Sequence, residues 1–197
     1  MNTFKYIIPA PAELFCDEAT VLSIEKISSF YLDEKFADFT SVVKDLFSFF
    51  SYNVTESKSA GDAVLTITQA ALPPEAFIIE ITPSNVKIES AAAPGVFYAL
   101  ECLRQMLFAA AISSPQGAVL TCGTVKDTPR FAFRSFHLDS ARHFQNIKVI
   151  KRMLRLMATF RLNTFHWHLV DKQGWRLQLK TTAGLENCYT NTPGFYT

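Results

Sequence analysis

The fold is decided by FRSFHLDSARHF, residues 133–144, and NTFHWHLVDKQGWRLQLK, residues 163–180. Residues 133–138 and 164–169 are predicted strands, and residues 148–160 between them have the apolar spacing of an amphipathic helix. Two strands joined by one helix of this length form a parallel pair with a right-handed crossover. The carboxyl ends of both strands are therefore expected at the same edge of the sheet, where functional groups gather in such folds.

Polar side chains follow the end of each of these predicted strands. They are Asp139, Arg142 and His143 after the first strand, and Asp171, Lys172, Gln173 and Trp175 after the second. Arginine offers a planar set of donors that suits two oxygens at once, such as vicinal sugar hydroxyls or a carboxylate. A ligand-binding site and an Arg142–Asp171 ion pair that only joins two loops fit this spacing equally well.

His166 and His168 lie two residues apart on a predicted strand, so both side chains point to one face. The same spacing begins the zinc site of some barrel metallohydrolases, which makes a zinc hydrolase a competing interpretation. Zinc requires three or more protein ligands, and His137 and His143 on the neighbouring strand and loop would complete only a weak cluster. Histidines packed in a barrel wall are the favoured interpretation, and we expect neither a metal nor a cofactor.

Composition narrows the class of protein. Hydrophobic residues make up 49% and charged residues 19% of the sequence, which is typical of a globular chain. The net charge is +1 without a long basic run, which argues against nucleic acid or a membrane as partner. No apolar run approaches the roughly 20 residues of a membrane span, and Pro9 and Pro11 interrupt any secretory signal. Localisation stays open, because a periplasmic or secreted protein whose signal was removed would look the same.

Residues 1–128 have the pattern of a separate small domain. Apolar spacing predicts strands at residues 21–27, 63–68, 77–82, 86–90 and 118–125, and helices at residues 34–50 and 94–111. Residues 77–82 and 86–90 are joined by a short Pro-Ser-Asn turn and form a predicted hairpin. We expect an α+β domain whose antiparallel sheet carries two helices on one face. The four scattered cysteines are expected to be buried free thiols.

The two long motifs resemble those of a known enzyme family. PRFAFRSFHLDSARHF, residues 129–144, and LNTFHWHLVDKQGWR, residues 162–176, resemble the β-N-acetylhexosaminidases of glycoside hydrolase family 20 nearly throughout. YIIPAP, residues 6–11, and PGVFYALECLRQML, residues 94–107, also resemble segments of that family. The resemblance therefore covers the chain from about residue 6 onward.

This resemblance implies a small α+β domain at residues 1–128 and the start of a (β/α)8 barrel at residues 129–197. It implies a retaining exo-enzyme that removes terminal N-acetylhexosamine from glycoconjugates or chito-oligosaccharides, with the 2-acetamido oxygen of the substrate attacking the anomeric carbon. Arg142 falls on the family's sugar-binding arginine and Asp171 on an aspartate that supports the catalytic acid. The resemblance places Asp139, His143, His166, His168 and Trp175 in the barrel wall or behind the residues that touch the sugar.

Two departures from the family pattern bear on activity. Lys172 replaces the second aspartate of the family's Asp-Asp-Gln step. The catalytic Asp-Glu pair is expected beyond residue 197, because a (β/α)8 barrel takes about 250 residues. We therefore expect an amino-terminal part of a hexosaminidase that is inactive alone and whose open sheet edge is covered by the rest of the barrel or by a partner. The alternative is a stand-alone interaction module built on the small domain.

Overall fold

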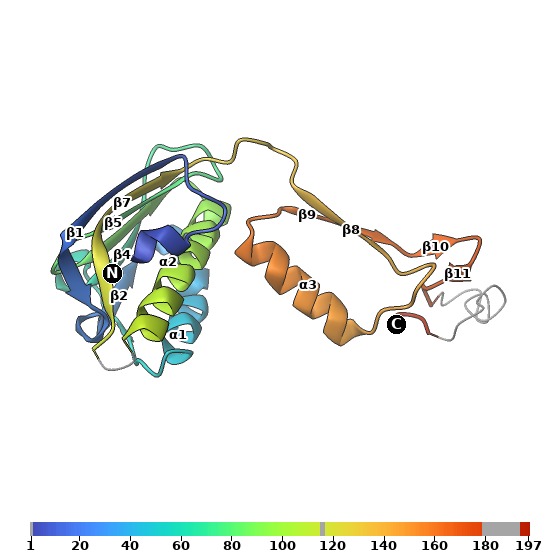
Figure 1. Cartoon of the computed structure of the whole chain (residues 1–197), viewed down its shortest axis with the longest axis horizontal. Coiled ribbons are helices and arrows are strands. Elements are labelled where there is room, and N and C mark those ends of the chain that lie inside the picture. Colours follow the sequence, from blue (N-terminus) through green and yellow to red (C-terminus); the bar gives the residue numbers. More distant parts are fainter. Residues whose placement is uncertain (1, 115–116, 179–193) are drawn as a thin grey trace. The chain divides into compact units, whose positions relative to one another are not determined.

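The computed structural model describes residues 2–114, 117–178 and 194–197, and the chain divides into two compact units. The first unit is Met1–Arg130 and the second unit is Phe131–Thr197. Each unit is described by itself, and Figure 1 shows the elements of both.

The first unit contains a seven-stranded mixed sheet with the strand order β1-β7-β5-β6-β4-β2-β3. Its strands are β1 (Glu13–Ser23), β2 (Ser29–Leu32), β3 (Thr55–Glu56), β4 (Leu65–Gln69), β5 (Phe77–Ile81), β6 (Val86–Ser90) and β7 (Val119–Asp127). The predicted hairpin is confirmed as the antiparallel pair β5–β6. The prediction of a fully antiparallel sheet is wrong, because β2 pairs in parallel with β3 and β4, and β4 pairs in parallel with β6. A helix lies between β2 and β4 in the chain, and such a crossover brings two strands back in the same direction.

Two α-helices, α1 (Thr40–Ser48) and α2 (Ala93–Ser113), lie on the same face of this sheet, as expected (Figure 1). Four short 3-10 helices join the elements: η1 (Thr3–Tyr6), η2 (Ile24–Lys26), η3 (Glu34–Phe39) and η4 (Ala60–Asp62). The strands alternate buried and more exposed residues, as in β5, where Phe77, Ile79 and Ile81 are buried. The single large apolar core found in the described residues lies in this unit.

Helix α2 is long and apolar enough, by length and composition, to cross a membrane, which the sequence analysis did not anticipate. However, 67% of its apolar window is buried inside the unit. Core helices of soluble proteins pass the same test, so this property of α2 is weak support for a membrane span. Cys102 on α2 and Cys122 on β7 are buried free thiols and Cys16 on β1 is a half-buried one, whereas Cys188 lies outside the described residues.

The edge strand β1 is longer than the sequence pattern indicated. It pairs antiparallel with β7 from Glu13 onward, with a register shift between Asp17 and Val21. Gly123 on β7 permits this pairing, because a Cβ at that position would lie 2.2 Å from the carbonyl oxygen of Phe15. Most of the first half of β1 is exposed, which explains why an apolar pattern did not reveal it.

The second unit begins with a strand–helix–strand sequence. Strands β8 (Ser135–Asp139) and β9 (Thr164–His168) flank helix α3 (Ile147–Thr159). The two strands pair in parallel, as predicted, with Phe136 opposite Phe165. A short antiparallel ladder of β10 (Val170–Asp171) and β11 (Gly174–Trp175) follows directly. This order is the one expected of the start of a (β/α)8 barrel, and the barrel itself stays a prediction.

Candidate functional site

The parallel register of β8 and β9 places their polar carboxyl ends together. Asp139 is the residue opposite His168 in the ladder. Beyond this pair the backbone turns, and the N–H groups of Ser140 and Ala141 donate to the carbonyl oxygen of His168 at 3.0 and 3.1 Å. The turn fixes the direction in which the next residue, Arg142, leaves the sheet.

Arg142 stands between two carboxylates. Its guanidinium forms an ion pair with Asp139, and its Nη2 lies 2.7 Å from Oδ2 of Asp171. Its backbone N–H also donates to Oδ1 of Asp139 at 3.0 Å. The arginine side chain remains 52% exposed, so solvent or a ligand reaches it. The ion pair that the spacing allowed is therefore present, on a side chain that is still accessible.

Asp171 lies in the β10–β11 hairpin. Together with Asp139, Arg142 and His168 it forms what we call the strand-end cluster. Its Oδ2 lies 3.1 Å from Nε2 of His168, and its Oδ1 accepts from the backbone N–H of Lys172 at 2.6 Å. The N–H of Lys172, then His168 and Arg142, hold the pKa of Asp171 below its ordinary value. The backbone N–H and then the guanidinium of Arg142 likewise lower the pKa of Asp139, and Asp139 is the main cause that raises the pKa of Arg142. The carboxyl groups of Asp139 and Asp171 and the guanidinium of Arg142 are therefore all charged at neutral pH.

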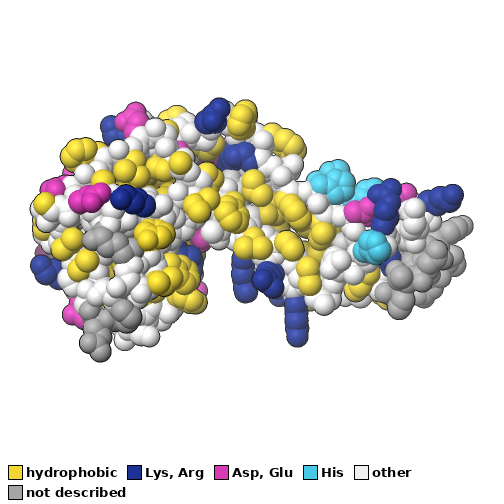
Figure 2. Space-filling view, in the orientation of Figure 1, with side chains coloured by type: hydrophobic (Ala, Val, Ile, Leu, Met, Phe, Trp, Pro, Cys, Tyr) yellow, Lys and Arg dark blue, Asp and Glu magenta, His cyan; other side chains and the backbone are white. Residues whose placement is uncertain are grey.

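Three of the four histidines lie on β8 and β9, close to this cluster. The rings of His137 and His166 are 4.4 Å apart between centroids, and those of His137 and His168 are 5.8 Å apart. His143 is exposed in the turn after β8. Figure 2 shows histidine side chains beside basic and acidic ones on the second unit. Within residues 2–114, 117–178 and 194–197, no group of three or more His, Cys, Asp or Glu side chains is placed to hold a metal ion.

Trp175, a predicted site residue, lies in the β10–β11 hairpin, and its indole Nε1 donates to the carbonyl oxygen of Leu177 at 2.7 Å, which connects the hairpin to the residues that follow it. Arg176, directly after the hairpin, is not among the predicted site residues, although its side chain is fully buried against the turn that carries Arg142. A lone arginine after an aromatic residue gives no sign of burial, because arginines are mostly exposed.

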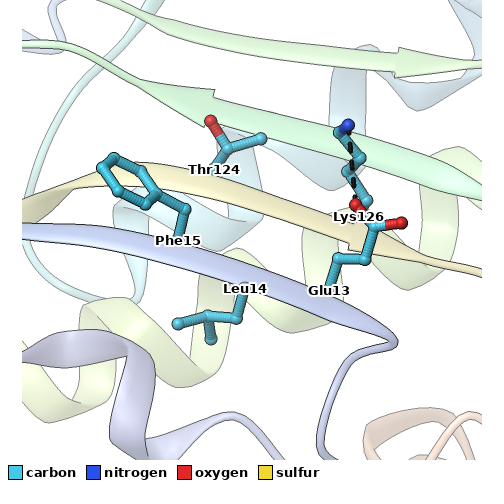
Figure 3. A pocket seen from close by; sticks show the side chains of 5 residues that line it. All are labelled: Glu13, Leu14, Phe15, Thr124 and Lys126. Atoms are coloured by element: carbon cyan, nitrogen blue, oxygen red, sulfur yellow. Dashed lines mark ion pairs between the residues drawn. The ribbon is translucent and has the colours of Figure 1, made fainter.

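The first unit has a surface pocket of a different kind. It lies between β1 and β7 and is lined by Glu13, Leu14, Phe15, Thr124 and Lys126. Figure 3 shows Leu14 on the opposite side of the strands from the other four side chains. The only ion pair between these five joins Nζ of Lys126 to Oε2 of Glu13 at 3.6 Å, and both side chains are more than half exposed. A solvated ion pair at a sheet edge is common, so the strand-end cluster remains the candidate site.

Two family models together match nearly the whole chain. Residues 5–128 match "Glycosyl hydrolase family 20, domain 2", and residues 131–197 match "Glycosyl hydrolase family 20, catalytic domain". The chain belongs to glycosyl hydrolase family 20. The strand-end cluster thus lies in the part that matches the catalytic domain of the family.

Individual relatives agree with this membership. A β-hexosaminidase from Porphyromonas gingivalis is 36% identical over 153 residues, which are 70% of this chain and 19% of the relative. One from Vibrio furnissii is 33% identical over 128 residues, 64% of this chain and 20% of the relative. The crystal structure of β-N-acetylhexosaminidase from Bacteroides fragilis superimposes with a TM-score of 0.85 at 27% identity, covering 98% of this chain and 40% of that one. The chain therefore spans about a fifth of the length of these curated relatives and two fifths of that structure.

Proposed function

We propose that this chain is the amino-terminal part of a retaining exo-β-N-acetylhexosaminidase. The enzyme would hydrolyse terminal N-acetylhexosamine from glycoconjugates or chito-oligosaccharides. In the proposed reaction the 2-acetamido oxygen of the substrate attacks the anomeric carbon, while an acid protonates the leaving oxygen. The observation that carries the proposal is the Arg142–Asp171 pair at the carboxyl ends of two parallel strands, within residues that match the family's catalytic domain.

In this proposal Arg142 binds the sugar. A guanidinium carries five N–H donors in a rigid plane, more than its two carboxylate partners require. Asp139 and Asp171 hold that plane from two sides, and its 52% exposure leaves room for hydroxyl oxygens. Preorganised donors of this kind lose little freedom when they bind a ligand, which favours binding in a fixed orientation.

Asp171 supports the acid in this proposal. Its carboxylate is held in the ionised form by the N–H of Lys172, by His168 and by Arg142, so it can orient a neighbouring proton carrier without being protonated itself. His168 contacts Oδ2 of Asp171, the oxygen that Arg142 also contacts, and so links Asp171 to strand β9. Asp139, His143, His166, His168 and Trp175 are proposed to line the barrel wall or to support these two residues, and no residue of this chain is proposed to make or break the glycosidic bond.

The domain assignment follows the same proposal. Residues 1–128 form the small domain and residues 129–197 the beginning of the barrel. The rest of the barrel, or a partner that covers the open edge of β8–β9, is proposed to complete the catalytic site. We expect the chain alone to be inactive for this reason.

A chromogenic N-acetyl-β-glucosaminide tests the assignment. The purified chain should show no turnover, whereas a polypeptide in which the rest of a family 20 barrel follows residue 197 should show it. In that longer polypeptide, Arg142→Ala and Asp171→Asn should each lower kcat/KM by about a hundredfold or more, because both act on the bound sugar or its acid. Arg152→Ala, at an exposed arginine of α3, is the matched control and should leave kcat/KM unchanged.

Two results would contradict this proposal. Turnover by the pure 197-residue chain would show that the bond-breaking groups lie within it. Full activity of the Arg142→Ala enzyme would show that the strand-end cluster only joins two loops.

A stand-alone interaction module is the second candidate, and the closed apolar core of the first unit favours it. In that case the first unit is the working part, and the second unit docks onto a partner or onto itself. Size-exclusion chromatography with light scattering distinguishes the two: a monomer with a single cooperative melt favours the module.

A further inference from the structure

Arg176 is the largest fully buried side chain among the described residues, although it is charged. Its Nε donates to the carbonyl oxygen of Ser140 at 2.9 Å, and its Nη2 donates to that of Ala141 at 3.0 Å. Its Nη1 donates to the carbonyl oxygen of Gly194 at 3.0 Å. A buried guanidinium is costly unless its N–H groups are hydrogen-bonded, and these three bonds offset part of that cost.

Two of the three acceptors belong to the turn that carries Arg142. Ser140 and Ala141 directly precede Arg142, and their own N–H groups donate to His168 on β9. The carbonyl side of the turn is thus held by Arg176 and its amide side by the strand pair. The hydroxyl of Ser140 also accepts from Nε1 of Trp167 at 2.9 Å, and its Oγ lies 3.1 Å from the hydroxyl oxygen of Tyr196, which donates to the carbonyl oxygen of Gln145.

Arg176 also follows immediately after the hairpin that carries Asp171. Asp171 is opposite Gly174 in the β10–β11 ladder, and the N–H of Arg176 donates to the carbonyl oxygen of Leu169 at 3.0 Å. The hairpin approaches the turn closely, since a Cβ on Gly174 would lie 2.7 Å from the carbonyl oxygen of Ala141. One side chain therefore connects the backbone on which Arg142 stands to the backbone on which Asp171 stands.

We propose that Arg176 is a positioning residue, which locks the Arg142 turn to the Asp171 hairpin and so sets the geometry of the Arg142–Asp171 pair. This inference rests on the proposed function for its role in sugar binding. A lysine would not substitute, because its ammonium is a single point of charge, whereas the planar guanidinium reaches three carbonyl oxygens in fixed directions.

The experiment uses the full 197-residue chain with Arg176→Lys, and Arg152→Lys on α3 as matched control. Amide hydrogen exchange at Ser140, Ala141 and Arg142 measures how firmly the turn is held. NMR titration of the carboxyl group of Asp139 measures whether Arg142 keeps its place, because the backbone N–H and then the guanidinium of Arg142 are the main causes that lower this pKa. In Arg176→Lys we expect exchange at these amides to be faster by about tenfold or more, and the pKa of Asp139 to rise toward its ordinary value.

The carboxyl titration separates positioning from support of the fold alone. If Arg176 only fills space, the half-buried carboxyl group of Asp139 keeps its lowered pKa while exchange becomes faster, and the proposal is overturned. Unchanged exchange at the turn would overturn it as well. Neither measurement involves sugar cleavage, so failure of the proposed function would leave this test intact.

A second variant covers the case in which Arg176→Lys unfolds the second unit, which would appear as lost protection of the Phe136 and Phe165 amides. Tyr196→Phe removes the hydroxyl that bonds Ser140 and the carbonyl oxygen of Gln145, and leaves Arg176 in place. With Arg176 holding the turn, we expect the pKa of Asp139 to stay as low as in wild type. A rise as large as that expected for Arg176→Lys would show that Tyr196, and not Arg176, positions Arg142.

Discussion

The guanidinium of Arg142 lies 2.7 Å from the carboxylate of Asp171, and this pair joins the turn after β8 to the hairpin after β9. The contact is long-range in sequence and depends on the parallel register that places Asp139 opposite His168. Its consequences for stability are measurable without a substrate.

The ion-pair cluster makes the second unit sensitive to acid. The folded-state pKa values of Asp139 and Asp171 are both lowered from 3.8, so their contribution to stability is fully present above that value. This contribution to stability is lost as the pH falls below 3.8 and then through the pKa values of the folded state. Both tryptophans, Trp167 and Trp175, lie in the second unit, so urea unfolding followed by tryptophan fluorescence at several pH values measures this loss.

Asparagine variants provide the controls for that measurement. Asp171→Asn and Asp139→Asn should each reduce the dependence of the fluorescence midpoint on pH below 3.8, the ordinary value from which both pKa values are lowered. Asp17→Asn removes a carboxyl whose pKa is also lowered, but in the first unit, and should leave the tryptophan midpoint unchanged. An equal acid response in wild type and Asp171→Asn would contradict the role of the cluster.

Asn146 caps helix α3, because its side-chain Oδ1 accepts from the backbone N–H of Val149 at 3.1 Å. Asn146→Ala should lower the free energy of unfolding of the second unit by about 1 kcal/mol, since one N–H of the first turn loses its partner. Asn146→Asp keeps the acceptor and should be close to wild type. Urea unfolding followed by tryptophan fluorescence measures both variants, and equal midpoints for alanine and aspartate would argue against the cap.

Gly123 is required by the close approach of β7 to β1. Gly123→Ala would place a methyl group 2.2 Å from the carbonyl oxygen of Phe15 and strain a backbone with φ of 152°, so the two strands must separate. We expect a loss of about 2 kcal/mol or more in the first unit, measured by thermal unfolding with far-UV circular dichroism. Gly61→Ala, whose Cβ would have its nearest neighbour at 3.7 Å, should change stability by less than about 0.5 kcal/mol.

Ser51 adopts a left-handed conformation with φ of 65° shortly after α1, and its N–H donates to the carbonyl oxygen of Ser48 at 2.9 Å. Residues with a Cβ are strained there, so Ser51→Gly should raise the free energy of unfolding by about 0.5–1 kcal/mol. Ser48→Gly makes the same chemical change at the last residue of α1 and should lower the free energy of unfolding. Chemical denaturation followed by circular dichroism measures the sign of each change.

Local patterns predicted the elements better than the pairing between them. The β5–β6 hairpin and the parallel β8–β9 pair follow from a short turn and from a single crossover helix, which are visible in sequence. The short strand β2 was missed, and with it the parallel β2–β4 pair around α1. A four-residue strand between two 3-10 helices carries too little alternation to be recognised.

In the candidate site, too, sequence patterns predicted some features and not others. Position after a strand end predicted the meeting of Asp139, Arg142 and Asp171, because the rule concerns the backbone direction of neighbouring strands. Arg176 could not be predicted in this way. Its burial arises from the close approach of the hairpin to the turn, which depends on the Cβ-free surface of Gly174 and not on any periodic pattern.

The β10–β11 ladder consists of only two residue pairs, and Asp171 is a member of one of them. So short a ladder contributes little cooperativity of its own, and the hairpin is expected to detach and reclose while β8 and β9 remain paired. Asp171, one partner of the Arg142–Asp171 pair, thus belongs to a segment that opens and closes in an equilibrium of its own. A sugar held by the closed form would draw that equilibrium toward closure, so binding and ordering of the hairpin would be thermodynamically linked.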